Sequence, residues 1–185
     1  MLAAVWCVVV FPNCASAQQS KYNTHTNLAE ITFAPNPFGK RIVTSVLANS
    51  DKAASYVKLY CRGGGGKQFI ETASTSGAQV VYIDNPGHAI STNDIVVYVY
   101  GDGAAPLRTT VSSSATNSIT MATGISQAGT TSDSVYELTQ QGEMLVGTSA
   151  LNLAGDILFA PPSDSPLYAT LNANTSAVLT VTVGQ

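Results

Sequence analysis

The segment Ser55-Tyr-Val-Lys-Leu-Tyr-Cys61 decides the fold, because its side chains alternate strictly between two faces. Val57, Leu59 and Cys61 fall on one face, and two tyrosines and a lysine fall on the other. A period of two residues is typical of a strand with one buried side, because successive strand side chains point in opposite directions. The segment therefore predicts a strand that covers a hydrophobic core.

Similar short runs, separated by Gly, Pro, Asn and Asp, follow one another from residue 29 to the end of the chain. The other runs are Ala29–Phe33, Arg41–Leu47, Gln68–Glu71, Gln79–Ile83, Asp94–Tyr100, Leu107–Val111, Asn117–Met121, Ser134–Leu138, Glu143–Val146, Asp156–Phe159, Leu167–Leu171 and Ala177–Val183. No window shows a convincing amphipathic helix of three turns or more. This pattern predicts an all-β protein.

The spacing of the runs predicts how the chain is divided. Long strands lie within residues 28–66 and 141–185, whereas residues 67–140 contain short hairpins joined by Ser, Thr and Gly. We therefore expect a β-sandwich formed by both ends of the chain, with a small β-barrel or hairpin subdomain inserted at 67–140. Residues 1–27 are expected to form an apolar leader or an extended arm.

The charge composition argues against nucleic acid as a partner. Charged residues make up 10% of the chain and its net charge is −3, whereas an ordinary soluble domain has about 25% charged residues. The densest group of cations, Lys58, Arg62 and Lys67, is too sparse to follow a phosphate backbone. A hydrophobic fraction of 45% is sufficient for a substantial core.

Two interpretations of the amino terminus stay open. Leu2–Phe11 is a ten-residue apolar run, and the small residues of Ala15-Ser-Ala17 resemble a signal-peptide cleavage site. Cleavage near Ala17 would place the mature protein in the periplasm or outside the cell. Alternatively, the run is a buried arm that inserts into a neighbouring subunit. It is too short to span a bilayer as a helix, so no stable membrane span is expected.

The sequence Gly63-Gly-Gly-Gly-Lys67 resembles part of a phosphate-binding loop but does not fit one. Such a loop needs a Ser or Thr after the lysine and then a helix whose amino terminus holds the phosphate. Here Gln68 follows, and then a strand is expected. We interpret the glycines as a flexible linker, a hinge into the inserted subdomain.

No catalytic, cofactor-binding or metal-binding residues are predicted. His25 and His88 are isolated in polar segments, and the cysteines at 7, 14 and 61 lack the spacing of a metal site. No G-x-S-x-G elbow is present to hold a nucleophilic serine. The protein is therefore expected not to be an enzyme.

Other candidate ligands have simpler explanations. Five aspartates fall in or beside expected turns, where their side chains accept hydrogen bonds from the backbone: Asp84, Asp94, Asp102, Asp156 and Asp164. Tyr56 and Tyr60 share one strand face, and so do Tyr98 and Tyr100. Each tyrosine pair suits an interface or the core, with sugar binding less favoured. Asn174-Thr-Ser176 matches a glycosylation acceptor.

Four stretches resemble small β-rich virion structural proteins of tailed bacteriophages, of the capsid decoration and head-fibre type. They are Asn49–Tyr60, Ser91–Val99, Ser132–Leu138 and Asp164–Val183. The resemblance lies in the style of the strands and implies a structural subunit of a virion. Its implied partners are copies of itself and other virion proteins, including a major capsid protein. The alternative is a secreted bacterial adhesin or carbohydrate-binding module that recognises a surface glycan.

Overall fold

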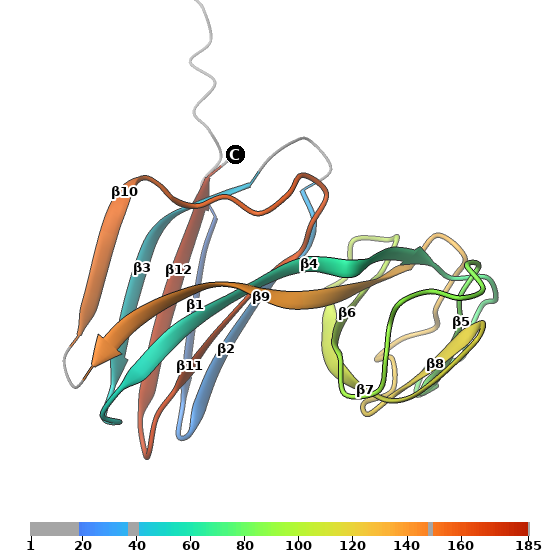
Figure 1. The fold of residues 1–185 in the computed structure, drawn as a ribbon, viewed down its shortest axis with the longest axis horizontal. Coiled ribbons are helices and arrows are strands. Elements are labelled where there is room, and N and C mark those ends of the chain that lie inside the picture. Colours follow the sequence, from blue (N-terminus) through green and yellow to red (C-terminus); the bar gives the residue numbers. More distant parts are fainter. Residues whose placement is uncertain (1–18, 37–40, 148–149, 185) are drawn as a thin grey trace, which may run out of the picture.

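The computed structural model describes residues 19–36, 41–147 and 150–184, and within them regular structure consists of strands (Figure 1). The strands are β1 (Gln19–His25), β2 (Leu28–Phe33), β3 (Ile42–Ser50), β4 (Ser55–Phe69), β5 (Val80–Tyr82), β6 (Ile95–Val99), β7 (Leu107–Ala115), β8 (Ser118–Met121), β9 (Ser134–Gly147), β10 (Leu151–Phe159), β11 (Leu167–Asn172) and β12 (Ala177–Gly184). Over the described ranges, no helix has the length and hydropathy needed to cross a membrane.

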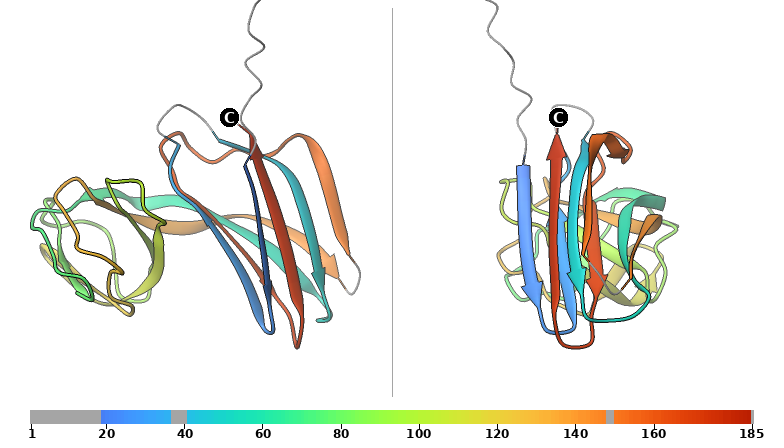
Figure 2. Two further views of the ribbon diagram at one scale, coloured as in Figure 1. Left: turned by 180° about the vertical axis from the view of Figure 1, so that it is seen from behind. Right: turned by 90° about the vertical axis from the view of Figure 1, so that its left-hand side faces the viewer.

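Both ends of the chain form a β-sandwich, as the sequence predicts. One sheet has the order β1-β12-β3-β10, and the facing sheet begins β2-β11-β4-β9, with antiparallel pairing throughout. Figure 2 shows the strands of the smaller sheet side by side in front of the larger sheet. The all-β sandwich expected from the period-two runs is therefore confirmed.

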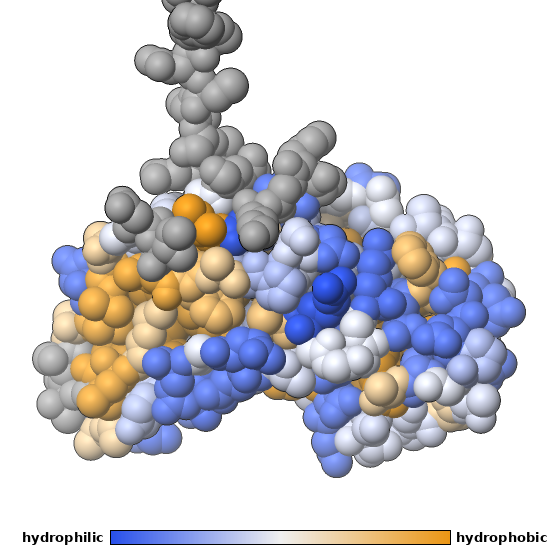
Figure 3. Space-filling model, turned by 45° about the horizontal axis from the view of Figure 1, so that its top comes forward, coloured by the Kyte–Doolittle hydropathy of each residue, from blue (hydrophilic) through white to orange (hydrophobic). Residues whose placement is uncertain are grey.

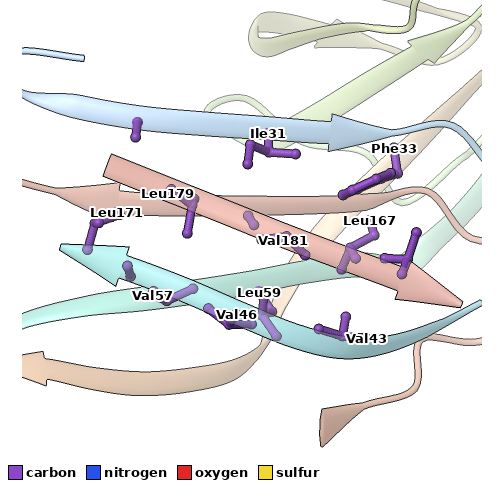
Figure 4. Packing of buried hydrophobic residues seen from close by; sticks show 14 of the residues in the cluster. Ile31, Phe33, Val43, Val46, Val57, Leu59, Leu167, Leu171, Leu179 and Val181 are labelled. Atoms are coloured by element: carbon purple, nitrogen blue, oxygen red, sulfur yellow. The ribbon is translucent and has the colours of Figure 1, made fainter. Parts of the chain in front are cut away.

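Alternating strand residues fill the space between the sheets. In β12, the side chains of Ala177, Leu179 and Val181 point inward and are buried, and Thr180 between them is only half-buried. Val57 and Leu59 of β4 face them from the other sheet and are completely buried (Figure 4). Full burial of a leucine or valine side chain contributes about 1.5–3 kcal/mol. The same alternation that reveals the strands in the sequence thus builds the core.

The middle of the chain closes into a small β-barrel beside the sandwich (Figure 1). The larger sheet continues from β9 through β6, β7 and β8 to β5. A bridge between Ile70 and Ile83 then joins the β5 side to the end of β4. Twelve buried residues that include Tyr98 and Met121 fill the interior. The Glu71 amide donates to the Tyr82 carbonyl and the Asp84 amide donates to the Phe69 carbonyl, so the backbone on the two sides of this closure is paired.

Two long strands connect the sandwich to the barrel, and the glycines lie inside one of them. Gly63–Gly66 is part of β4, as a bulge opposite Glu137 of β9. The Gly65 amide donates to the buried Glu137 carboxylate at 2.6 Å, and a Cβ on Gly63 would lie 2.5 Å from that carboxylate. The prediction of a flexible linker is therefore wrong: the glycines allow a close approach that fixes the backbone.

The barrel also packs against the sandwich through side chains. Val97, Tyr136 and Leu138 form a buried cluster with Tyr168 of β11. Arg108 of β7 pairs with Glu30 of β2 at 3.5 Å, and the Tyr168 hydroxyl donates to the same carboxylate. Burial raises the pKa of Tyr168, and its hydrogen bond to Glu30 raises it further. The phenol therefore stays protonated as a donor.

The sandwich begins earlier in the chain than residue 28. Gln19–His25 forms β1, which pairs along its full length with β12. The apolar run and the candidate cleavage site, with Cys7 and Cys14, lie outside the described residues. Both interpretations of residues 1–17 therefore stay predictions.

Asp51 stabilises the end of the sandwich at which β3 ends and β12 begins. Its carboxylate accepts the Thr175 hydroxyl and the amides of Asn174, Thr175 and Ser176. The bonds from Thr175 are the main reason that the pKa of Asp51 lies far below its usual value of 3.8. The ionised carboxylate therefore holds the loop before β12 in place.

We expect Asp51→Asn to lower the melting temperature at neutral pH. Because the pKa is depressed in the folded state, the stabilisation is fully present above the unfolded pKa of 3.8 and is lost as the pH falls toward the folded pKa. The difference from the wild type should thus shrink in melting curves recorded from pH 7 to pH 2. A difference that grows on acidification would contradict the assignment.

Candidate interaction surfaces

An apolar surface is formed by β10, the outermost strand of the smaller sheet, together with the end of β9 in the larger sheet. We define the β10 edge surface as Met144, Leu145, Leu151, Leu153, Ala154, Leu158 and Phe159. Leu145 is 59% exposed, and the inward-facing Leu151 and Phe159 are only half-buried at the open side of the sandwich. In Figure 3, hydrophobic residues gather over the sandwich at the end away from the barrel.

The backbone of β10 is also free along one side. In the described chain it pairs only with β3, and its register shifts between Ala154 and Phe159. The opposite edge strand, β1, exposes mainly polar side chains such as Ser20 and Thr24. An apolar edge with unpaired amides and carbonyls is a site where another strand can add. The β10 edge is therefore the best candidate for a protein interface.

A second feature, a hydrogen-bond network around the Asp133 carboxylate, lies inside the barrel. Its carboxylate accepts the Tyr98 hydroxyl at 2.7 Å, the Gly101 amide at 2.8 Å and the Thr130 amide at 2.9 Å. Burial alone would raise the pKa of Asp133, but these hydrogen bonds outweigh burial and lower it. The same burial and hydrogen bond raise the pKa of Tyr98. The Asp133 carboxylate therefore ties the backbone at Gly101 and Thr130 to the Tyr98 hydroxyl in the barrel core.

Four of the five aspartates singled out in the sequence lie in or beside turns, and most of them accept hydrogen bonds from nearby groups. Asp94 accepts the Ser91 amide at 2.7 Å, Asp102 accepts the Ala104 amide at 2.9 Å, and Asp164 pairs with Arg62 at 3.0 Å. Asp84 is exposed. The turn position predicted for Asp156 is wrong, because this residue lies within β10, which begins earlier than the sequence predicts. The described residues contain no cluster of three or more His, Cys, Asp or Glu that could hold a metal ion.

The two histidines and Cys61 are not part of such a cluster in the described part of the chain. His25 ends β1 and accepts the Asn27 amide, whereas His88 lies in the turn after Asn85. Cys61 is buried, and burial raises its thiol pKa, which keeps the sulfur in its unreactive protonated form.

The two tyrosine pairs have different surroundings. Tyr98 and Tyr100 are buried in the barrel, with ring centroids 5.0 Å apart, so they belong to the core. Tyr56 and Tyr60 are half-buried on the outer face of the larger sheet, and Tyr60 packs on Tyr168 at 5.4 Å. The exposed Asn174 lies in the turn that Asp51 holds.

The barrel wall carries two exposed aromatic residues that the sequence analysis missed. Phe69 is 48% exposed and Tyr82 is 45% exposed. The bridge between Ile70 and Ile83 makes them diagonal neighbours on adjacent strands. The Lys67 ammonium lies 4.5 Å from the Phe69 ring centroid. Their separation in sequence hides this pair, because only barrel closure brings the two segments together.

A groove between sandwich and barrel gathers positive charge. One end has a cavity volume of about 480 Å³ and is lined by Lys21 and Arg41, and the other end includes Lys67 and Asp164. The two ends share Ala34–Asn36, Gly103 and Ala104. Three of the eight Lys and Arg of an acidic chain therefore line one groove. Lys21 and Arg41 lie in segments where no motif marks them.

Comparisons with known proteins do not identify the chain. No family model matches the sequence, and no curated protein matches it. One solved structure, the subviral particle of infectious bursal disease virus VP2, is 13% identical, with 97% of this chain covered and a TM-score of 0.12. A mutant VP2 of that virus in T=1 particles is 14% identical, with 99% of this chain covered and a TM-score of 0.10. This chain spans less than half of either VP2 chain, 45% and 43%. Similarity this weak supports no statement about fold or function.

Proposed function

We propose that the protein is a non-enzymatic structural subunit of a virion, a decoration or cement protein that assembles through the β10 edge surface. The observation that carries this proposal is an edge strand that is both apolar and unpaired on one side. Such an edge is a liability in an isolated chain, because it can template aggregation. When a specific neighbouring subunit covers the β10 edge, the edge becomes an interface.

The rest of the molecule suits this role. With 10% charged residues, ion pairs are scarce, so contacts between copies must rely on apolar area and backbone hydrogen bonds. The histidines, the buried thiol and the Asp133 network lack the arrangement of a nucleophile with its base. The closed barrel presents a mostly hydrophilic face away from the β10 edge (Figure 3).

We expect the chain of 19.2 kDa to form oligomers in solution and the double variant Leu145→Lys, Ala154→Lys to be monomeric. Both residues are exposed, so the substitutions leave the core intact. Ala154→Lys puts a charge on the edge strand β10, which opposes strand addition, and Leu145→Lys puts one on the adjoining apolar end of β9. Light scattering coupled to size-exclusion chromatography measures the mass directly. The matched control is Thr24→Lys on the exposed β1 edge, which should keep the oligomer.

The virion assignment needs a second measurement. Particles purified from cells that carry the gene should contain the protein in stoichiometric amounts by mass spectrometry, and antibodies against it should label their surface in electron micrographs. A wild-type chain that is monomeric at all concentrations and absent from such particles would refute the proposal.

A secreted adhesin or carbohydrate-binding module is the second candidate, and the aromatic pair on the barrel wall favours it. Phe69 and Tyr82 expose ring surface side by side, and aromatic faces bind the apolar faces of sugar rings. The intact mass of the purified protein separates the two candidates. A chain that begins at Gln18 would support secretion, whereas retention of Met1 would support assembly inside the cell.

A further inference from the structure

The cationic end of the groove contains the guanidinium of Arg41, which has an N–H group that donates to none of the described residues. Arg41 is only 6% exposed, and one of its amino groups donates to the Ala34 carbonyl. Its second amino group lies 3.5 Å from the Gln19 side-chain oxygen, a long contact. The Nε–H is buried and has no hydrogen-bond partner among the described residues. A buried donor without a partner is costly unless a ligand satisfies it.

A second cation stands beside this guanidinium. The Lys21 ammonium lies 5.1 Å from the Phe33 ring centroid, and the Arg41 guanidinium lies 5.3 Å from the same ring. Lys21 is at the exposed rim and donates to the Thr32 carbonyl, which leaves two of its three donors for another group. Burial lowers the pKa of Lys21, and the positive charge of Arg41 lowers it further.

The described residues supply no anion to this pair. The ion pairs among them join Arg62 to Asp164 and Arg108 to Glu30, and neither includes Lys21 or Arg41. Asp164 lines the far end of the groove, but Arg62 neutralises it at 3.0 Å. Two adjacent cations that repel each other in a groove favour the entry of a negative group.

The shape of the donors selects the kind of anion. A guanidinium offers its Nε–H and one amino group along one edge, and this fork matches the two oxygens of a carboxylate. The groove also runs along Gln19–Lys21, the start of the edge strand β1, whose outer side is unpaired within the described sheet. An extended peptide can add to such an edge and place alternate side chains in the adjacent pocket.

From these features we infer that the groove binds an acidic, extended segment of a partner protein, with one carboxylate held by Arg41 and Lys21. This inference rests on the proposed structural role, because it names a contact between the subunit and a different virion protein. It uses the β1 side of the sandwich, across the sheet from the β10 edge surface. A substitution that disrupts one contact is therefore expected to leave the other intact.

The test uses the full ¹⁵N-labelled chain and a capped synthetic peptide in which glutamate alternates with threonine and valine. We expect the peptide to shift the Arg41 Nε–H signal and the amide signals of Ser20 and Lys21 in a saturable manner. Lys21→Gln removes one charge-assisted hydrogen bond from an exposed position and should weaken binding about tenfold. Lys52→Gln, in the turn after β3, is the matched control and should bind as the wild type does.

Three results would overturn the inference. They are equal binding of a peptide with glutamine in place of glutamate, equal binding by the Lys21→Gln variant, and binding of succinate alone as tight as that of the peptide. Light scattering on the Lys21→Gln variant distinguishes a failure of this inference from a failure of the proposed function. The variant should keep its oligomeric mass, because that mass depends on the β10 edge.

Discussion

Replacing Asp133 with alanine is expected to destabilise the chain by about 3 kcal/mol, because buried donors would lose their shared acceptor. The carboxylate accepts hydrogen bonds from Tyr98, Gly101 and Thr130 and is 2% exposed. Alanine has no side-chain oxygen that could accept hydrogen bonds from these groups. The Tyr98 hydroxyl, inside the barrel, would then be buried without its partner.

Urea unfolding at pH 7 measures this loss, and Asp84→Ala provides the control. Asp84 is exposed beside the same barrel, so its replacement should change the free energy of unfolding by less than about 0.5 kcal/mol. The lowered pKa of Asp133 adds a test by pH. Its stabilisation is present above the unfolded pKa and is lost as the pH falls through the folded pKa, so the two proteins should converge in acid. Equal unfolding of Asp133→Ala and the wild type at pH 7 would show that the network contributes nothing.

The sequence predicts the strands and the sandwich well, because both depend on local alternation. Val57 and Leu59 are buried and the intervening Lys58 is not, as the period of two residues requires. Polar residues at turns also mark where strands end: Asp51 follows directly after β3, and Asp102 lies in the turn after β6, where its side chain accepts the Ala104 amide. These signals lie within a few residues of one another, so no knowledge of the partner strand is needed.

What the sequence does not reveal depends on pairing across long distances. Four consecutive glycines predict flexibility, but Glu137 lies more than seventy residues away and turns them into an ordered bulge. The groove is hidden for the same reason, because Lys21 of β1 and Arg41, the residue before β3, come together only after β1 and β3 have both paired with β12. The polar segment before residue 28 gave no sign of a strand, since β1 is an edge strand and has almost no buried face.

Leu179→Ala is expected to cost about 3–4 kcal/mol, because it removes a large side chain from the sandwich core. Leu179 is completely buried in β12, the strand that joins β1 to β3 and lies over the facing sheet (Figure 4). Loss of its branched end leaves a cavity between two sheets that cannot both move inward, because each is fixed by antiparallel pairing. Calorimetry and urea unfolding measure the change.

The neighbouring residue gives the matched control for this truncation. Thr180→Ala alters the same strand at a half-buried outer position and should cost less than about 1 kcal/mol. Because β4 and β9 pass through both the sandwich and the barrel, we expect Leu179→Ala to shift the unfolding of both together. Hydrogen exchange at Val96 in β6 reports on the barrel, and Val46 in β3 reports on the sandwich. Faster exchange at Val46 with unchanged exchange at Val96 would show instead that the barrel folds as an independent unit, with the β4–β9 ribbon acting only as a tether.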